Sequence, residues 1–147
     1  MWKLITSERI SRWRDFRNSL NNMSAEQALN ATMDFWQSCP FAPFYLDASS
    51  PAEWPNPWEL ISENYYCDLA KCLGIVYTVI LSKHGEDLNP EIRIYVNTKT
   101  RLTYHLAVFG QGKYVINFAD GEIVNIESIT KEFQLKYQYQ KTELKTE

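Results

Sequence analysis

Apolar residues recur at helical spacing through the first part of the chain. In residues 7–20 they stand at Ile10, Trp13, Phe16 and Leu20, and Thr6 or Ser7 is available as an N-cap. In residues 24–38, Ser24 is followed three residues later by Gln27, which is the spacing of a capping box. The apolar positions that follow keep one helical face: Ala28, Leu29, Thr32, Phe35 and Trp36. The pattern therefore predicts two amphipathic helices.

Residues 39–57 interrupt this pattern, because they contain five of the six prolines. Proline cannot continue a helix and pushes the residue before it toward extended geometry. The segment nevertheless carries large apolar side chains, at Phe41, Phe44, Tyr45 and Trp54. A flexible linker would be rich in Gly and Ser instead. We expect an ordered loop, anchored over the core by its aromatic residues, and not a domain boundary.

A third helix is predicted to begin after Asn56, with Asn56 as N-cap and Pro57 as first helical residue. Its end is ambiguous, since Gly74 could be a C-cap followed by a strand over residues 75–82. Alternatively, the helix continues to His84. The apolar stripe keeps the helical period through Tyr77, which favours the continuous helix and places Cys67 in its interior.

The second half of the chain changes to short β-rich runs at residues 91–97, 102–109, 113–118 and 121–126, separated by turn sequences. This order predicts an α+β fold, with N-terminal helices packed on a C-terminal antiparallel β-meander. We expect a single domain over residues 1–147, which comprises a mainly helical part (1–84), the sheet (91–129), and a terminal strand and tail (130–147).

Strand periodicity returns near the end of the chain, where apolar residues at 133, 135, 137 and 139 alternate with polar ones. One interpretation is a last edge strand of the same sheet. The other is a strand offered to a neighbouring protein by β-augmentation. Aromatic residues dominate the energetics of protein interfaces. The candidate partner-binding residues are Phe133, Leu135, Tyr137, Tyr139, Trp54 and Trp58.

Composition and charge exclude several classes of function. The chain has 147 residues, is 45% hydrophobic, and has a net charge of -3, so it is globular and lacks a positive field for nucleic acid. The longest apolar run ends at Ser82, which is too short to span a membrane. The cysteines, Cys39, Cys67 and Cys72, and two distant histidines show no metal-ligand spacing. We predict no metal, no cofactor, no nucleic acid and no membrane partner.

The hairpin "YHLAVFGQGKYVIN" (residues 104–117) suggests chemistry, because a three-residue loop would place His105 directly across from Asn117. A two-residue loop would pair His105 with Phe118 instead. Asp120, three residues beyond Asn117, is an alternative group to orient the imidazole. A His held by Asn or Asp, with a Cys on a preceding helix, is the order of a cysteine-nucleophile triad.

The segment "YYCDLAKCLGI" (residues 65–75) resembles the nucleophile helix of transglutaminase-like and papain-like domains. That resemblance implies Cys67 as nucleophile, His105 as base, and Asn117 or Asp120 as the orienting group. In those families the Cys stands at a helix N-terminus, whereas the predicted helix here begins about ten residues earlier. A Cys in the middle of a helix is usually an inert apolar residue.

Three other segments resemble small uncharacterised proteins of large tailed phages: residues 5–20, residues 54–85 and residues 112–125. That resemblance implies a non-enzymatic structural or assembly component of a viral particle, with neighbouring subunits as partners and the virion or the host cytoplasm as its location. We rank this hypothesis first. The alternative is a small cysteine hydrolase or transferase that uses Cys67, His105 and Asn117 or Asp120.

Overall fold

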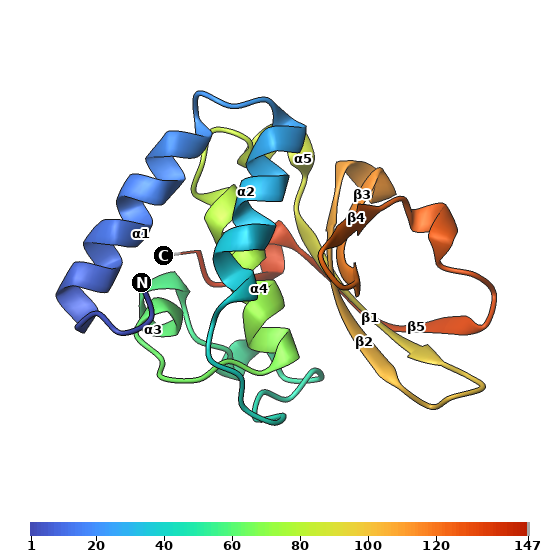
Figure 1. Ribbon diagram of the computed structural model, residues 1–147. Coiled ribbons are helices and arrows are strands. Elements are labelled where there is room, and N and C mark those ends of the chain that lie inside the picture. The colour runs from blue at the N-terminus through green and yellow to red at the C-terminus, as the bar shows by residue number, and fades with distance from the viewer. Residues whose placement is uncertain (147) are drawn as a thin grey trace.

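The computed structural model describes residues 1–146, in which helices precede an antiparallel sheet (Figure 1). The helices are α1 (Thr6–Leu20), α2 (Ala25–Gln37), α3 (Pro57–Ile61), α4 (Asp68–Ile80) and α5 (Gly85–Leu88). The strands are β1 (Glu91–Asn97), β2 (Thr103–Phe109), β3 (Tyr114–Ala119), β4 (Glu122–Val124) and β5 (Phe133–Gln140). The predicted α+β class is confirmed.

The first two helices form where the apolar spacing predicts them. The Gln27 amide donates to Ser24 Oγ at 3.2 Å and the Ser24 amide donates to Gln27 Oε1 at 3.0 Å, so the predicted capping box is present. The N-cap of α1 is Ile5, with no side-chain cap. The expected cap at Thr6 or Ser7 is therefore wrong.

The long third helix of the sequence prediction is two helices in the structure. Asn56 caps α3 as expected, with the Glu59 amide 2.8 Å from Asn56 Oδ1, but α3 ends at Ile61. The backbone of Tyr66 then pairs with the proline-rich segment, since its amide donates to the Pro40 carbonyl at 2.8 Å and its carbonyl accepts from Ala42 at 3.1 Å. Extended backbone at Tyr66 is incompatible with a continuous helix. The prediction that Cys67 lies in a helix interior is wrong, because Cys67 is the N-cap of α4.

Helix α4 continues through residues 75–80, so the helical interpretation of this run is confirmed over the strand alternative. The helix ends at Ile80, so the expected continuation to His84 is wrong. Helix α4 contacts helices α2 and α3 as well as strands β1 and β2. Gly74 allows the close approach of α2, because a Cβ there would lie 2.5 Å from the Trp36 ring. One turn later, Thr78 Oγ1 accepts hydrogen bonds of 3.0 Å from the indoles of both Trp13 and Trp36. Gly74 is thus a packing residue and not a C-cap.

The sheet has the order β4-β3-β2-β1-β5, so the terminal strand is an edge strand of the same sheet. Strand β5 pairs with β1, and the register shifts between Ile94 and Tyr95. Ile94 faces Tyr137 whereas Tyr95 faces Leu135, which leaves Lys136 as the extra residue of a β-bulge. The bulge puts Leu135 and Tyr137 on opposite faces of the sheet, despite their alternation in sequence.

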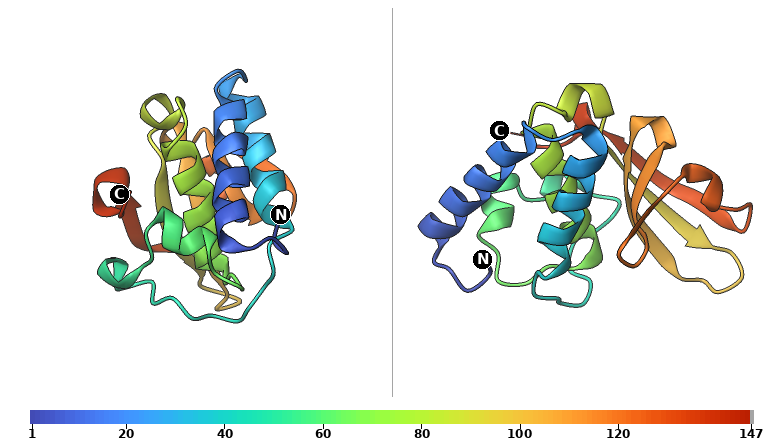
Figure 2. Two further views of the ribbon diagram at one scale, coloured as in Figure 1. Left: turned by 90° about the vertical axis from the view of Figure 1, so that its left-hand side faces the viewer. Right: turned by 45° about the horizontal axis from the view of Figure 1, so that its top comes forward.

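Of the four aromatic residues expected to anchor the loop between α2 and α3, only Trp54 is buried. Phe41, Phe44 and Tyr45 are exposed, so the expectation is wrong for these three. Trp54 is 2% exposed, donates to the Asp47 carbonyl at 2.7 Å, and stands edge-on to Tyr139 with ring centroids 4.9 Å apart. The Tyr139 hydroxyl donates to the Ala48 carbonyl. The two turned views in Figure 2 show this loop running past the helices toward the sheet. In the described part of the chain, no helix is long and apolar enough to cross a membrane.

Candidate active site at the N-terminus of helix α4

Cys67 starts α4, with extended backbone at φ -79° and ψ 173°. Its carbonyl accepts the first helical hydrogen bond, from the Lys71 amide at 2.9 Å, and its side chain makes no cap bond. The amides of the first helical turn have no partner within a helix. Together with the helix dipole, these amides favour a negative charge beside the N-terminus. The position is therefore suited to a thiolate.

Strand β2 lies alongside α4 and runs in the same direction. The short helix α5, which follows α4, contacts the Gly110–Gly112 turn that follows β2, so the C-terminal ends of both elements meet. The Cys72 thiol donates to the main-chain carbonyl of His105 at 2.8 Å. Cys67 precedes Cys72 by five residues, or about 7.5 Å along a helix axis. The contact therefore brings the N-terminus of α4 to the end of β2 that bears His105.

The His105 side chain is on the helix-facing side of the sheet and is 9% exposed. Burial lowers the pKa of the imidazole from its ordinary value, and the negative charge of nearby Asp68, the first residue of α4, opposes that change. Nδ1 of His105 is buried and has no hydrogen-bond partner among the described residues. The ring is thus neutral at pH 7 and available as a proton acceptor.

The hairpin register that would place His105 across from Asn117 is wrong. Phe109 pairs with Tyr114, so the connection contains four residues, and three of them have positive φ. Asn117 itself has a φ of 77°. Its side-chain amide donates to the His105 carbonyl at 2.9 Å and approaches Cys72 Sγ at 3.4 Å. Asn117 therefore holds the main chain of His105, and no hydrogen bond in the described structure joins it to the imidazole.

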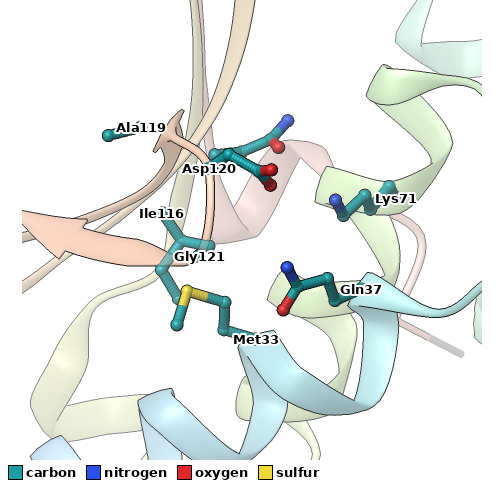
Figure 3. Close-up of a pocket in the computed structure, with 8 residues that line it drawn as sticks. Met33, Gln37, Lys71, Ile116, Ala119, Asp120 and Gly121 are labelled. Carbon is teal, nitrogen blue, oxygen red and sulfur yellow. The ribbon is translucent and has the colours of Figure 1, made fainter.

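Asp120 also lies away from the imidazole. It lines a small pocket with Lys71 of α4 and Gln37 of α2. Figure 3 shows the side chains of Asp120 and Lys71 directed toward each other across this pocket. They form no ion pair in the described structure. The structure thus brings Cys67 and His105 to adjoining elements, whereas neither Asn117 nor Asp120 is bonded to the ring.

Residues 40–45 cover the start of α4. Phe41 bridges to Tyr66, and the Tyr45 hydroxyl donates to the Tyr65 carbonyl at 3.1 Å. Burial raises the pKa of Tyr45. Cys67 is only 2% exposed. The sulfur is therefore closed to a substrate in this structure.

The other cysteines are in environments that disfavour a thiolate. Burial raises the pKa of the Cys72 thiol to about 12, and that of the Cys39 thiol to about 11. All three cysteines are free. Among residues 1–146, no three His, Cys, Asp or Glu side chains gather as they would around a metal ion.

A cleft of about 340 Å³ opens beside His105, between the sheet and the covering loop. Its floor is formed by Ile94 and Val96 of β1 with Thr103 and His105 of β2. Phe44 and Ala48 of the loop form one wall, and Lys136 and Tyr137 of β5 form the other. The cleft is large enough for a side chain of a peptide substrate.

The residues predicted to bind a partner differ in how exposed they are. Leu135, Tyr137 and Trp58 are exposed at 41%, 39% and 37%. Trp54 and Tyr139 pack inside the domain. Phe133 contacts the rings of Tyr104 and Phe118 on the outer face of the sheet. Whether any of them binds another protein stays a prediction.

Two important residues were missed by the sequence analysis, Asp68 and Arg9. An acidic residue directly after Cys67 is typical of a first helical turn and could have indicated a new helix start. Arg9 is 7% exposed and donates to the carbonyls of Ile61 and Glu63 at 3.2 and 2.6 Å, which fixes the connection that leads to Cys67. No local pattern reveals that role, because the partners are more than 50 residues apart.

Comparison with known proteins finds a likeness in structure only. No family model and no curated protein sequence matches the chain. Calcium-bound LapG of Legionella pneumophila superposes with a TM-score of 0.72 at 13% identity, over 93% of this chain and 77% of that one. A second LapG structure has a TM-score of 0.72 at 14% identity, over 91% and 74%. The EGTA-treated form has a TM-score of 0.71 at 13% identity, over 91% and 73%.

LapG has a transglutaminase-like cysteine protease fold. The shared fold agrees with the resemblance of residues 65–75 to transglutaminase-like and papain-like domains. The comparisons give no support to the resemblance to tailed-phage proteins, nor to a place in a virion. The chain therefore shares the fold of LapG, at an identity that establishes the fold alone.

Proposed function

We propose that this domain is a small cysteine hydrolase or transferase, in which Cys67 is the nucleophile and His105 the base. The observation that carries the proposal is the position of Cys67 at the N-cap of α4, the helix that is bonded to β2 at His105. The shared fold with LapG supports the same class of chemistry. The proposal reverses the order in which the sequence alone ranked the two hypotheses.

The proposed reaction is acyl transfer in two steps. The neutral His105 imidazole takes the thiol proton of Cys67, and the sulfur forms a bond to the substrate carbonyl carbon. The bond to the leaving group breaks as the imidazolium returns the proton to it. Water or an amine then attacks the thioester, gives a proton to His105, and releases the thiol. The unpaired amides at the start of α4 are placed to stabilise the transient oxyanion.

The site differs from a complete triad, because no group is bonded to the His105 ring in the described structure. We propose that Asn117 acts through the main chain, since it fixes the His105 carbonyl between β3 and α4. Asp68 supplies the negative charge that acts on the ring. Cys67 and His105 would therefore react without an Asn or Asp side chain that orients the imidazole, which was the role expected of Asn117 or Asp120.

Competition among the three thiols of the native protein tests the proposal. We expect iodoacetamide at pH 6.5 to label Cys67 before Cys39 or Cys72, as measured by mass spectrometry of tryptic peptides. Cys39 is the internal control, because it is more exposed than Cys67. His105→Gln should slow labelling of Cys67 by about tenfold or more, within the range of general-base effects. Labelling of Cys39 ahead of Cys67, with no effect of His105→Gln, would reject the cysteine chemistry.

A second candidate function is contact with another protein through the exposed aromatic and aliphatic side chains. Phe41 and Phe44 are exposed at 67% and 68%, in addition to Leu135, Tyr137 and Trp58. Of these side chains, Phe44 and Tyr137 lie together in the cleft beside His105, and a contiguous exposed apolar patch is typical of an interaction site. Size-exclusion chromatography of the purified chain tests self-association, and a monomer at high concentration would remove neighbouring copies as the partner.

A further inference from the structure

We infer that the cleft beside His105 selects an acyl-donor peptide with an apolar side chain next to the attacked carbonyl and a carboxylate about three residues before it. This inference rests on the proposed cysteine chemistry, because it concerns which substrate that chemistry would accept. It follows from the row of residues across the sheet, from the lining of the cleft and from the bulge in β5.

The cleft residues lie in a row that crosses three strands. Ile94 of β1 pairs with His105 of β2 on one side and with Tyr137 of β5 on the other. Neighbouring strands are about 4.8 Å apart, so the His105 and Tyr137 backbones are about 10 Å apart. An extended peptide advances about 3.3 Å per residue and covers this span in about three residues. A substrate that reaches His105 at one end therefore meets β5 at the other.

The middle of the cleft is apolar. Ile94 and Val96 form the floor and Phe44 overhangs it, with Ala48 beside it. Phe44 is 68% exposed, so most of its side chain is open to solvent. Burial of an aliphatic or aromatic substrate side chain against these groups is favourable by about 25 cal/mol for each Å² removed from water. In the inferred binding mode, the substrate residue next to the attacked bond lies over Ile94, the β1 residue that pairs with His105.

The far end of the cleft is positively charged because of the bulge. Lys136 is the residue without a partner in β1, and it lines the cleft beside Tyr137. In a regular strand, Lys136 and Tyr137 would point to opposite faces. Lys136 forms no ion pair within residues 1–146, and none of the described residues that line the cleft is acidic. A substrate carboxylate is the complementary group.

The negative charge of Asp68 restricts where that carboxylate can bind. Asp68 acts on His105, at the opposite end of the row from Lys136. An anionic group next to the attacked carbonyl would be repelled by Asp68, whereas the same group three residues away would meet Lys136. The charges of Asp68 and Lys136 therefore favour a substrate carboxylate three residues from the attacked carbonyl over one next to it.

Two peptidyl vinyl sulfones test the inference. Both have Leu next to the electrophile, and they differ only in Glu or Lys three residues before it. Cys67 adds through sulfur to the alkene carbon attached to the peptide, and its proton goes to the alkene carbon beside the sulfone. We expect the Glu probe to label Cys67 about fivefold faster than the Lys probe at low salt, with the difference shrinking as salt rises. Lys136→Glu should reverse the preference.

Lys83→Glu is the matched control, because it makes the same change in net charge at an exposed position beyond the other end of α4. It should leave the preference unchanged. Equal labelling by the two probes in wild-type protein, or no effect of Lys136→Glu, would overturn the inference. Iodoacetamide, which carries no side chain or charge, distinguishes failure of the cysteine chemistry from failure of the substrate preference. If iodoacetamide labels Cys67 in a way that depends on His105 but the two probes label it equally, only the substrate inference fails.

Discussion

The thiol of Cys72 donates a 2.8 Å hydrogen bond to the main-chain carbonyl of His105, and this bond joins α4 to β2 within the core. The same carbonyl accepts from Asn117, so one oxygen ties together three elements. The arrangement fixes the position of the N-terminus of α4 along β2, the strand that bears the His105 imidazole.

Cys72→Ala tests the importance of this tie. Cys72 is completely buried, so the substitution removes both a hydrogen bond and the packing of the sulfur. We expect the free energy of unfolding to fall by about 1–3 kcal/mol, as measured by urea denaturation. Cys72→Ser is the matched variant, since its hydroxyl can still donate to His105. An alanine variant as stable as wild type would show that the contact contributes nothing.

Gly74→Ala should destabilise the domain although alanine is the better helix former. The gain in helix propensity is about 1 kcal/mol, but the new Cβ would lie 2.5 Å from the Trp36 ring. Overpacking of this kind costs about 1–3 kcal/mol or more, so the clash should outweigh the gain. In a Trp36→Phe background the same substitution should cost clearly less. Equal costs in both backgrounds, from urea unfolding, would contradict the packing explanation.

Tyr45→Ala should expose Cys67. The Tyr45 side chain holds residues 40–45 through its bond to the carbonyl of Tyr65, two residues before Cys67. We expect iodoacetamide to label Cys67 several-fold faster in this variant. Tyr65→Ala is the control, because Tyr65 is 59% exposed and contributes only its main chain to that bond. The cover hypothesis fails if both variants react at the wild-type rate.

The pKa of His105 gives a testable pH dependence. Burial lowers this pKa in the folded state, so folding favours the neutral ring. The stability from this group is complete above the unfolded pKa of about 6.5, and it is lost as the pH falls through the folded pKa. We expect urea midpoints to drop less between pH 7.5 and pH 5 in His105→Gln than in wild type. Parallel pH profiles would contradict the buried neutral ring.

Asp68→Asn should lower the pKa of His105 further, because the only opposing influence on that pKa is the negative charge of Asp68. NMR titration of the imidazole protons measures the change directly, and the chain has only two histidines, which simplifies assignment. The second histidine, His84, bonds to the Leu20 carbonyl and serves as the internal reference. An unchanged titration of His105 would show that Asp68 does not act on the ring.

Deletion of residues 133–147 should unfold the domain. Strand β5 pairs with β1 from Glu91 to Asn97, and Tyr139 packs against Trp54 of the loop. Circular dichroism of the truncated protein should show loss of the sheet, and replacement of Leu135 and Tyr137 by Ser should leave the fold intact, because both side chains are exposed. A truncated protein that stays folded would return β5 to the role of a strand for a partner.

The sequence by itself determined the parts of the fold that depend on neighbouring residues. Ser24 and Gln27 form their capping box, Asn56 caps α3, and the β-branched runs form strands, because each of these patterns acts over a few residues. The order of helices before strands was sufficient for the fold class. The sequence also showed the Cys and His of the candidate site, in the right order along the chain.

Only the tertiary structure decided where the long helical pattern breaks. The apolar stripe from Leu60 to Leu73 fits one helix, and the break arises because Tyr66 makes backbone hydrogen bonds to Pro40 and Ala42, more than 20 residues away. The one-residue shift of the hairpin and the bulge at Lys136 are likewise set by packing across the sheet. Local patterns cannot specify such pairings, because the free energy that fixes them comes from residues distant in sequence. Those pairings make Cys67 the N-cap of a helix and place Lys136 in the cleft.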